Sequence, residues 1–178
     1  GVLYYTSSLG QIYALDAATG AHKWKFTPKI DEERGMGTFY NPYNRGVAIG
    51  HGHVYMGTID GRLLAVDMNT GKLAWDTMLM TVEKGNKGFT GAPLVVKNMV
   101  VIGSNGGELS GCCGPIFGVD AKTGKMAWQF DTIGGDEASR KSWGNDSWKI
   151  GGGGGWMTGN YDAETNTVFW GTANPAPD

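Results

Sequence analysis

One stretch of sequence recurs along this chain and decides how it folds. It reads Asp16-Ala-Ala-Thr-Gly-Ala-His-Lys-Trp24, and it returns as Asp67-Met-Asn-Thr-Gly-Lys-Leu-Ala-Trp75, as Asp120-Ala-Lys-Thr-Gly-Lys-Met-Ala-Trp128 and, more loosely, as Asp162-Ala-Glu-Thr-Asn-Thr-Val-Phe-Trp170. In each copy the Trp follows the Asp by eight residues, and successive Asp residues are 51, 53 and 42 positions apart. A period near 50 residues is typical of repeat architectures.

Each repeat contains two predicted hairpins. The phrase itself joins two alternating runs, Tyr13–Asp16 and Lys23–Phe26, through Thr19-Gly20, where the Asp side chain can bind backbone amides and the Gly permits a positive φ. In the second repeat Asp60-Gly61 lies between two apolar runs, the strongest short signal of a hairpin. A preceding apolar run such as Val47–Gly50 brings the count to about four strands, which is the composition of a propeller blade.

The sequence therefore predicts an all-β chain that forms part of a β-propeller. Its 178 residues hold three to four blades at about 52 residues a repeat, and propellers have about four to eight blades. The chain starts inside a predicted strand and stops shortly after Asn174-Pro-Ala-Pro, so we expect one partial propeller domain over residues 1–178, with the remainder of the propeller as a partner. The repeated Trp is expected to pack against the neighbouring blade.

Composition excludes several classes of function. The net charge of −2 argues against a nucleic-acid-binding or anionic-membrane-binding surface. No run of 18 apolar residues occurs, so no membrane span is predicted. Gly accounts for 31 residues, well above average usage, and most of them fit the turns between many short strands.

Four side chains outside the predicted strands have two readings each. Glu108 is either a solvated turn carboxylate or a metal ligand, and Asn174 is either a turn cap or an oxygen ligand of a hard cation. Trp156 follows the run Gly151–Gly155, and it either packs on a blade face or stacks on a planar cofactor. Arg45 is either an ordinary surface residue or a fork for a cofactor carboxylate.

The two cysteines are adjacent, Cys112-Cys113, a spacing that fits no zinc site. They are either reduced thiols or a strained disulfide between neighbours. Such a bond closes almost no loop, so it would add little entropic stabilisation and would serve local shape or redox chemistry instead.

Taken together, these residues resemble the quinoprotein alcohol dehydrogenases, the methanol and ethanol dehydrogenase family that uses pyrroloquinoline quinone (PQQ). The repeated phrase resembles that family's tryptophan-docking repeat. The family's other motifs follow in its order and at close to its spacings: Asn44-Arg45-Gly46, residues 90–97, residues 103–109, the glycine run ending at Trp156, and residues 170–177.

The resemblance implies an eight-bladed propeller with the quinone near its axis. The residues that it implies for quinone binding are Arg45, Thr90, Asn105, Gly106, Gly107 and Trp156. Glu108 and Asn174 would coordinate the metal, Ca²⁺ or a lanthanide. The catalytic Asp is expected beyond Asp178, so none is expected within this chain. The implied reaction oxidises a primary alcohol to an aldehyde by hydride transfer to metal-bound PQQ, with electrons passed to a cytochrome c in the periplasm.

The sequence departs from the family where a lid over the quinone is expected. The family carries adjacent Cys just before Asn-Arg-Gly, as a disulfide ring over the cofactor, whereas this chain has Phe39-Tyr40-Asn41 there. Its own pair, Cys112-Cys113, follows Glu108 instead. The resemblance therefore implies either an aromatic lid or a relocated disulfide that borders the pocket, and the oxidising periplasm favours the bond.

Two rival interpretations separate on specific motifs. A non-catalytic propeller scaffold that binds protein partners would not need the glycine run with its Trp, Glu108 or Asn174, so their joint presence favours the enzyme. A quinohaemoprotein would add a cytochrome domain. Its Cys-x-x-Cys-His motif does not occur in this sequence, but the part of the protein expected to follow could hold one, so this alternative stays open. The expected partners are a small alcohol and a cytochrome c, with no nucleic acid. Whether the protein forms a homodimer is left open by the sequence.

Overall fold

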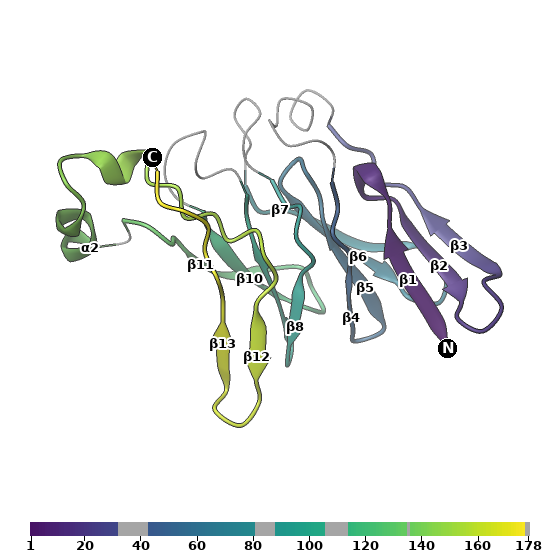
Figure 1. The fold of residues 1–178 in the computed structure, drawn as a ribbon. Helices are drawn as coiled ribbons and strands as arrows, with labels where there is room; N and C mark the ends of the chain where they lie inside the picture. Colours follow the sequence, from purple (N-terminus) through teal and green to yellow (C-terminus); the bar gives the residue numbers. More distant parts are fainter. Residues whose placement is uncertain (32–42, 81–87, 106–113, 135, 177–178) are drawn as a thin grey trace.

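Antiparallel β-sheets follow one another across the molecule, in the order of the sequence (Figure 1). The computed structural model describes residues 1–31, 43–80, 88–105, 114–134 and 136–176. Among these residues no helix is long and apolar enough to cross a membrane. The all-β prediction is confirmed, and the sheets correspond to successive blades of a partial propeller.

The described strands form four sheets, each built from consecutive strands. The first contains β1 (Val2–Thr6), β2 (Ile12–Asp16) and β3 (His22–Phe26). The second contains β4 (Ala48–Gly50), β5 (His53–Gly57), β6 (Arg62–Asp67) and β7 (Leu73–Met78). The third contains β8 (Leu94–Val96), β9 (Met99–Gly103), β10 (Ile116–Asp120) and β11 (Met126–Phe130). The fourth is the hairpin of β12 (Asn160–Asp162) and β13 (Thr167–Phe169).

Helical structure is confined to short segments. Two 3-10 turns, Ser8–Gly10 and Ser147–Lys149, and one helix, α2 (Glu137–Ser142), are present in the described part of the chain. Helix α2 lies between β11 and β12 and begins at Asp136, whose carboxylate accepts a hydrogen bond from the Ser139 amide.

The turn inside the repeated phrase has the geometry that the sequence predicts. The Asp67 carboxylate accepts hydrogen bonds from the amides of Asn69 (3.1 Å) and Thr70 (2.8 Å) and from the Thr70 hydroxyl (2.8 Å). Asp16 and Asp120 repeat this arrangement, and the following glycines have φ near +70°. The hydrogen bonds from Thr70 lower the pKa of Asp67, because they favour its charged form.

The repeated Trp joins one sheet to the next, as predicted. Trp24 Nε1 donates to the carbonyl of Met68 at 3.1 Å, and its ring lies against Gly71. Trp75 Nε1 donates to the carbonyl of Ala121 at 3.3 Å, and its ring lies against Gly124. Each glycine is the positive-φ residue of the next copy of the phrase, so the phrase supplies both the docking Trp and the turn on which the preceding Trp docks.

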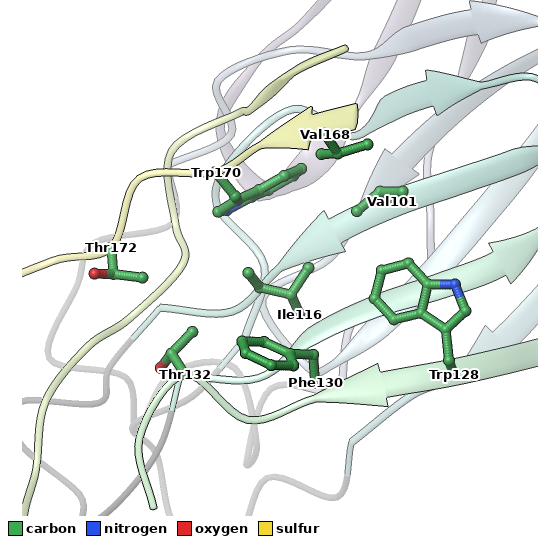
Figure 2. A pocket seen from close by; sticks show the side chains of 8 residues that line it. All are labelled: Val101, Ile116, Trp128, Phe130, Thr132, Val168, Trp170 and Thr172. Atoms are coloured by element: carbon green, nitrogen blue, oxygen red, sulfur yellow. The ribbon is translucent and has the colours of Figure 1, made fainter. Parts of the chain in front are cut away.

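Trp128 is not docked like Trp24 and Trp75, because its ring faces a groove and not the turn of a following copy of the phrase. The groove has a volume of ≈ 310 Å³, and Figure 2 shows Trp128 and Phe130 of β11 on one side and Val168 and Trp170 on the other. Trp128 is 43% exposed, and among the described residues its indole donates no hydrogen bond.

The fourth, looser copy of the phrase lies at a different place in its sheet from the first three. In the first three copies the phrase joins the last two strands of a sheet, whereas the fourth copy joins β12 to β13, the first two strands after β11. Trp170 follows β13, and its Nε1 donates to the carbonyl of Gly155, an earlier residue, at 2.9 Å. The shorter interval before Asp162, 42 residues instead of 51 or 53, reflects this different position.

Two apolar clusters fill the spaces between sheets. Ile12, Val54 and Met56 belong to a cluster shared by the first and second sheets. Tyr55, Phe89 and Phe117 belong to a cluster shared by the second and third, in which the two Phe rings meet edge to face at 5.8 Å. Burial of these large side chains is the main source of stability between adjacent blades.

A buried ion pair supports the second sheet. Asp60 is 1% exposed, and its Oδ2 lies 2.8 Å from Nη2 of Arg62. Burial alone would raise the pKa of Asp60, but hydrogen bonds from Arg62, Thr58 and the Asp31 amide outweigh it and lower that pKa. Arg62 also reaches the more exposed Asp76 at 2.6 Å, so one guanidinium serves two carboxylates.

Candidate functional site

The glycine run 151–155 is the backbone of the site. Its residues are buried, and it lies antiparallel to the segment that carries Asn174. The Gly153 amide donates to the carbonyl of Asn174 (2.9 Å), and the Ala173 amide donates to the carbonyl of Gly154 (2.8 Å). Thr132 adds a hydroxyl bond to the carbonyl of Gly153 at 2.7 Å. The run therefore holds the backbone of Asn174 by hydrogen bonds and leads directly into Trp156.

Close backbone approach explains the glycines at the start of the run, because a Cβ on Gly151 or Gly152 would clash with a backbone carbonyl, that of Trp148 or Asn174. The run is also approached by two glycines outside it: a Cβ on Gly103 would clash with the carbonyl of Gly155, and a Cβ on Gly114 would clash with Gly154. Gly151, Gly152 and Gly153 also have positive φ values of 40°, 76° and 69°, which L-residues with side chains adopt at a cost. The run packs tightly between β9, β10 and residues 173–176.

A hollow of ≈ 380 Å³ lies beside the glycine run. The residues that line it are Trp156, Met157, Gly171, Thr172, Ala173 and Asn174. The Arg45 guanidinium lies over the Trp156 ring, with Cζ 4.8 Å from the ring centre, and Tyr43 lies on Arg45 at 6.0 Å. Trp156 thus contacts one predicted site residue, Arg45, and lines the hollow with another, Asn174.

Thr90 and Asn105 hold the backbone near this hollow. Thr90 is 3% exposed, and its carbonyl accepts a hydrogen bond from the Arg45 amide at 2.9 Å. Asn105 is 5% exposed and binds Gly88 twice, through its side-chain oxygen (2.7 Å) and through its amide (3.0 Å). The side-chain oxygen of Asn105 therefore anchors the loop that contains Gly88, a role that the sequence did not predict.

The remaining predicted residues fall outside the described part of the chain. They are Gly106, Gly107, Glu108, Cys112, Cys113 and the expected lid Phe39-Tyr40-Asn41. Among the residues that the structure describes, no three His, Cys, Asp or Glu side chains come close enough to hold a metal ion. The metal site and the disulfide accordingly stay predictions.

Sequence reasoning missed several residues that line or shape the hollow. Met157 and Thr172 line it directly, and both are exposed there. Gly91 lies under the Trp156 carbonyl, where a Cβ would clash with the oxygen. The only available signal was their position inside the quoted motifs, next to Trp156, Asn174 and Thr90.

Comparison with known proteins places this arrangement in a family. The family model described as "Glucose/ethanol/alcohol dehydrogenase, beta-propeller domain" of the PQQ proteins matches residues 1–178. The chain belongs to the PQQ-dependent alcohol dehydrogenase family. Membership confirms the resemblance drawn from the docking phrase and the ordered motifs.

Relatives of this chain include quinohemoprotein and lanthanide-dependent dehydrogenases. The quinohemoprotein alcohol dehydrogenase ADH IIB of Pseudomonas putida is 40% identical over 99% of the chain and 27% of its own length. The lanthanide-dependent methanol dehydrogenase of Methylacidiphilum fumariolicum is 34% identical over 92% of the chain and 30% of its own length. The chain therefore spans less than a third of each relative.

A solved structure of the family has the same fold. The quinohemoprotein alcohol dehydrogenase ADHIIG from Pseudomonas putida HK5 superposes with a TM-score of 0.89 at 38% identity, covering 99% of this chain and 27% of that protein. The agreement confirms the partial propeller. The number of blades in the complete ring, eight by resemblance, is a prediction.

Proposed function

We propose that this chain forms one side of the quinone site of a PQQ-dependent alcohol dehydrogenase. The observation that carries the proposal is the position of Trp156, which lies under the Arg45 guanidinium and lines one hollow together with Asn174. Family membership supports the cofactor class. The whole protein would oxidise primary alcohols to aldehydes.

The residues present fit a planar, anionic quinone. PQQ is a flat ring system with carboxylates, so it needs an aromatic surface and a cation close together. Trp156 supplies the ring, and Arg45 supplies an exposed guanidinium that lies over one face of it. Gly91, Gly103 and Gly114 bring backbone close to the site where any side chain would intrude.

In this proposal the residues of this chain bind and orient the quinone, and they do not move the reacting proton. When bound, PQQ supplies the acceptor for a hydride from the alcohol carbon. Trp156 would fix the plane of the ring, and Arg45 would neutralise a carboxylate or bind a carbonyl at its edge. Glu108 and Asn174 would hold Ca²⁺ or a lanthanide through oxygen atoms, so that the ion can act as a Lewis acid. The general base, an Asp, would come from elsewhere in the protein.

The proposal extends to partners and compartment. The two electrons gained per alcohol would leave to a cytochrome c, in line with the quinohemoprotein and cytochrome c-linked relatives. We propose a periplasmic location, in which a disulfide between Cys112 and Cys113 could persist.

A reconstitution experiment tests the function. The complete protein, freed of cofactor, is supplied with PQQ and either Ca²⁺ or a lanthanide, and alcohol oxidation is followed with an artificial electron acceptor. Activity should require PQQ and a metal together. Glu108→Gln should reduce both bound metal and activity, because a hard cation prefers a charged oxygen ligand. Alcohol oxidation that does not depend on PQQ, or no oxidation under any combination, would contradict the proposal.

A further inference from the structure

Three consecutive residues, Thr90, Gly91 and Ala92, contact Arg45, Trp156 and Thr158 respectively. The Arg45 amide donates to the carbonyl of Thr90 at 2.9 Å. The Thr158 hydroxyl, two residues after Trp156, donates to the carbonyl of Ala92 at 2.7 Å. One short segment between β7 and β8 therefore sets the backbone positions on both sides of the Arg45–Trp156 pair.

Gly91 is the residue of this segment that lies against Trp156. It is buried, and a Cβ at this position would clash with the carbonyl oxygen of Trp156 and lie 3.2 Å from its carbonyl carbon. Its φ is outside the left-handed region, so the backbone conformation does not demand glycine. Glycine is required only because there is no room for a Cβ: the obstructing atoms belong to the backbone of Trp156 and cannot rotate away as the tip of a side chain could.

We propose that Gly91 is a positioning residue for the quinone site. It permits the Trp156 backbone to lie directly on the segment that also holds Arg45, and so it sets the separation of ring and guanidinium. This inference rests on the proposed function, since it assigns the pair to a planar anionic ligand. Any side chain at position 91 displaces Trp156 while the hydrogen bond to Thr90 keeps the Arg45 backbone in place.

A double-mutant cycle tests whether Gly91 acts through Trp156. The complete protein without cofactor is titrated with PQQ as wild type, Gly91→Ala, Trp156→Ala and the double variant. We expect Gly91→Ala to weaken PQQ binding by on the order of 10-fold in the wild-type background, and by less than about 2-fold when Trp156 is already Ala. Equal fold-losses in the two backgrounds, or no loss in either, would overturn the inference.

A spectroscopic readout separates failure of the inference from failure of the proposed function. The difference in fluorescence between wild type and Trp156→Phe isolates the emission of Trp156, without any quinone. Gly91→Ala should shift this difference spectrum because it changes the distance of the ring from the Arg45 charge. If wild-type protein binds no PQQ, the proposed function fails while this spectrum still tests the geometry. An unshifted spectrum would overturn the positioning role.

Two further variants distinguish a specific effect of Gly91→Ala from a general loss of structure. Gly118→Ala places a Cβ against Trp128, which does not line the hollow beside Trp156, and should leave both PQQ affinity and the Trp156 spectrum unchanged. Thr158→Ala removes only the hydroxyl bond to Ala92 and should weaken PQQ binding by about 5-fold, the value of one hydrogen bond. If Gly91→Ala does not fold, the absence of any effect in Thr158→Ala would count against the inference.

Discussion

The guanidinium of Arg45 lies over the ring of Trp156, with Cζ 4.8 Å from the ring centre. The same kind of contact occurs between Arg140 and Trp148 at 4.7 Å, in the segment that connects β11 and β12. The two pairs have matching geometry, but only the first adjoins the hollow that contains Asn174. They therefore provide a matched comparison between a candidate binding pair and a surface pair.

Arg45→Ala should weaken PQQ binding by about 10-fold or more, because a charge-assisted hydrogen bond contributes roughly 1.5–3 kcal/mol. The free energy of unfolding should change little, since the side chain is exposed. Isothermal titration with PQQ and urea unfolding measure the two effects. Arg140→Ala is the control and should leave PQQ affinity unaltered. Similar losses of affinity in both variants would show that the geometry of an Arg–Trp pair does not identify the site.

Trp75→Phe should reduce the free energy of unfolding by about 1 kcal/mol, because it keeps most of the ring but removes the hydrogen bond to Ala121. Trp24→Phe should behave alike through its bond to Met68. Urea unfolding of the complete protein provides the measurement. No loss in either variant would mean that the docking Trp acts through packing alone.

Asp67→Asn should flatten the dependence of stability on pH. Hydrogen bonds lower the pKa of Asp67 in the folded state, so its stabilising contribution is present above the unfolded pKa, about 3.9, and is lost as pH falls through the folded value. The Asn side chain still accepts the turn hydrogen bonds but does not titrate. Urea midpoints measured between about pH 2 and 7 should fall less steeply below about pH 4 than in wild type. An identical slope would assign the acid sensitivity to other carboxylates.

Arg62→Met should destabilise the protein by about 3–5 kcal/mol, because it leaves the Asp60 carboxylate buried without its counter-ion. Asp76→Asn, which removes the more exposed partner of the same Arg62, should cost less than about 1 kcal/mol. Thermal and urea unfolding compare the two. Equal costs would mean that the buried and exposed contacts of Arg62 are equivalent.

The strands and turns could be predicted from sequence because their signals are local. Asp60-Gly61 does join β5 to β6, and Asp67 does bind the amides that its spacing predicts. The position of Asp162–Trp170 could not be predicted in this way, since the same spacing suits the first hairpin of a sheet as well as the last. The one sequence signal of this different position was the short interval of 42 residues from Asp120 to Asp162.

The candidate site was predicted in part, through motifs and not through geometry. Arg45, Trp156 and Asn174 were named from their motifs, and the structure places Trp156 against Arg45 and beside Asn174 in the lining of one hollow. The role of Gly91 depends on a backbone contact with a residue 65 positions away, which no local pattern encodes. The contact of Asn105 with Gly88 is likewise a property of two loops that meet only in the fold.

The central claim is that Trp156 forms the surface on which the quinone stacks. Trp156→Ala in the complete protein tests it most directly, by PQQ titration beside equilibrium unfolding. Our account predicts a loss of PQQ affinity of on the order of 10-fold or more, with a loss of stability well below the roughly 3–5 kcal/mol of a core Trp→Ala change. A core-sized loss of stability with unchanged PQQ affinity would contradict it.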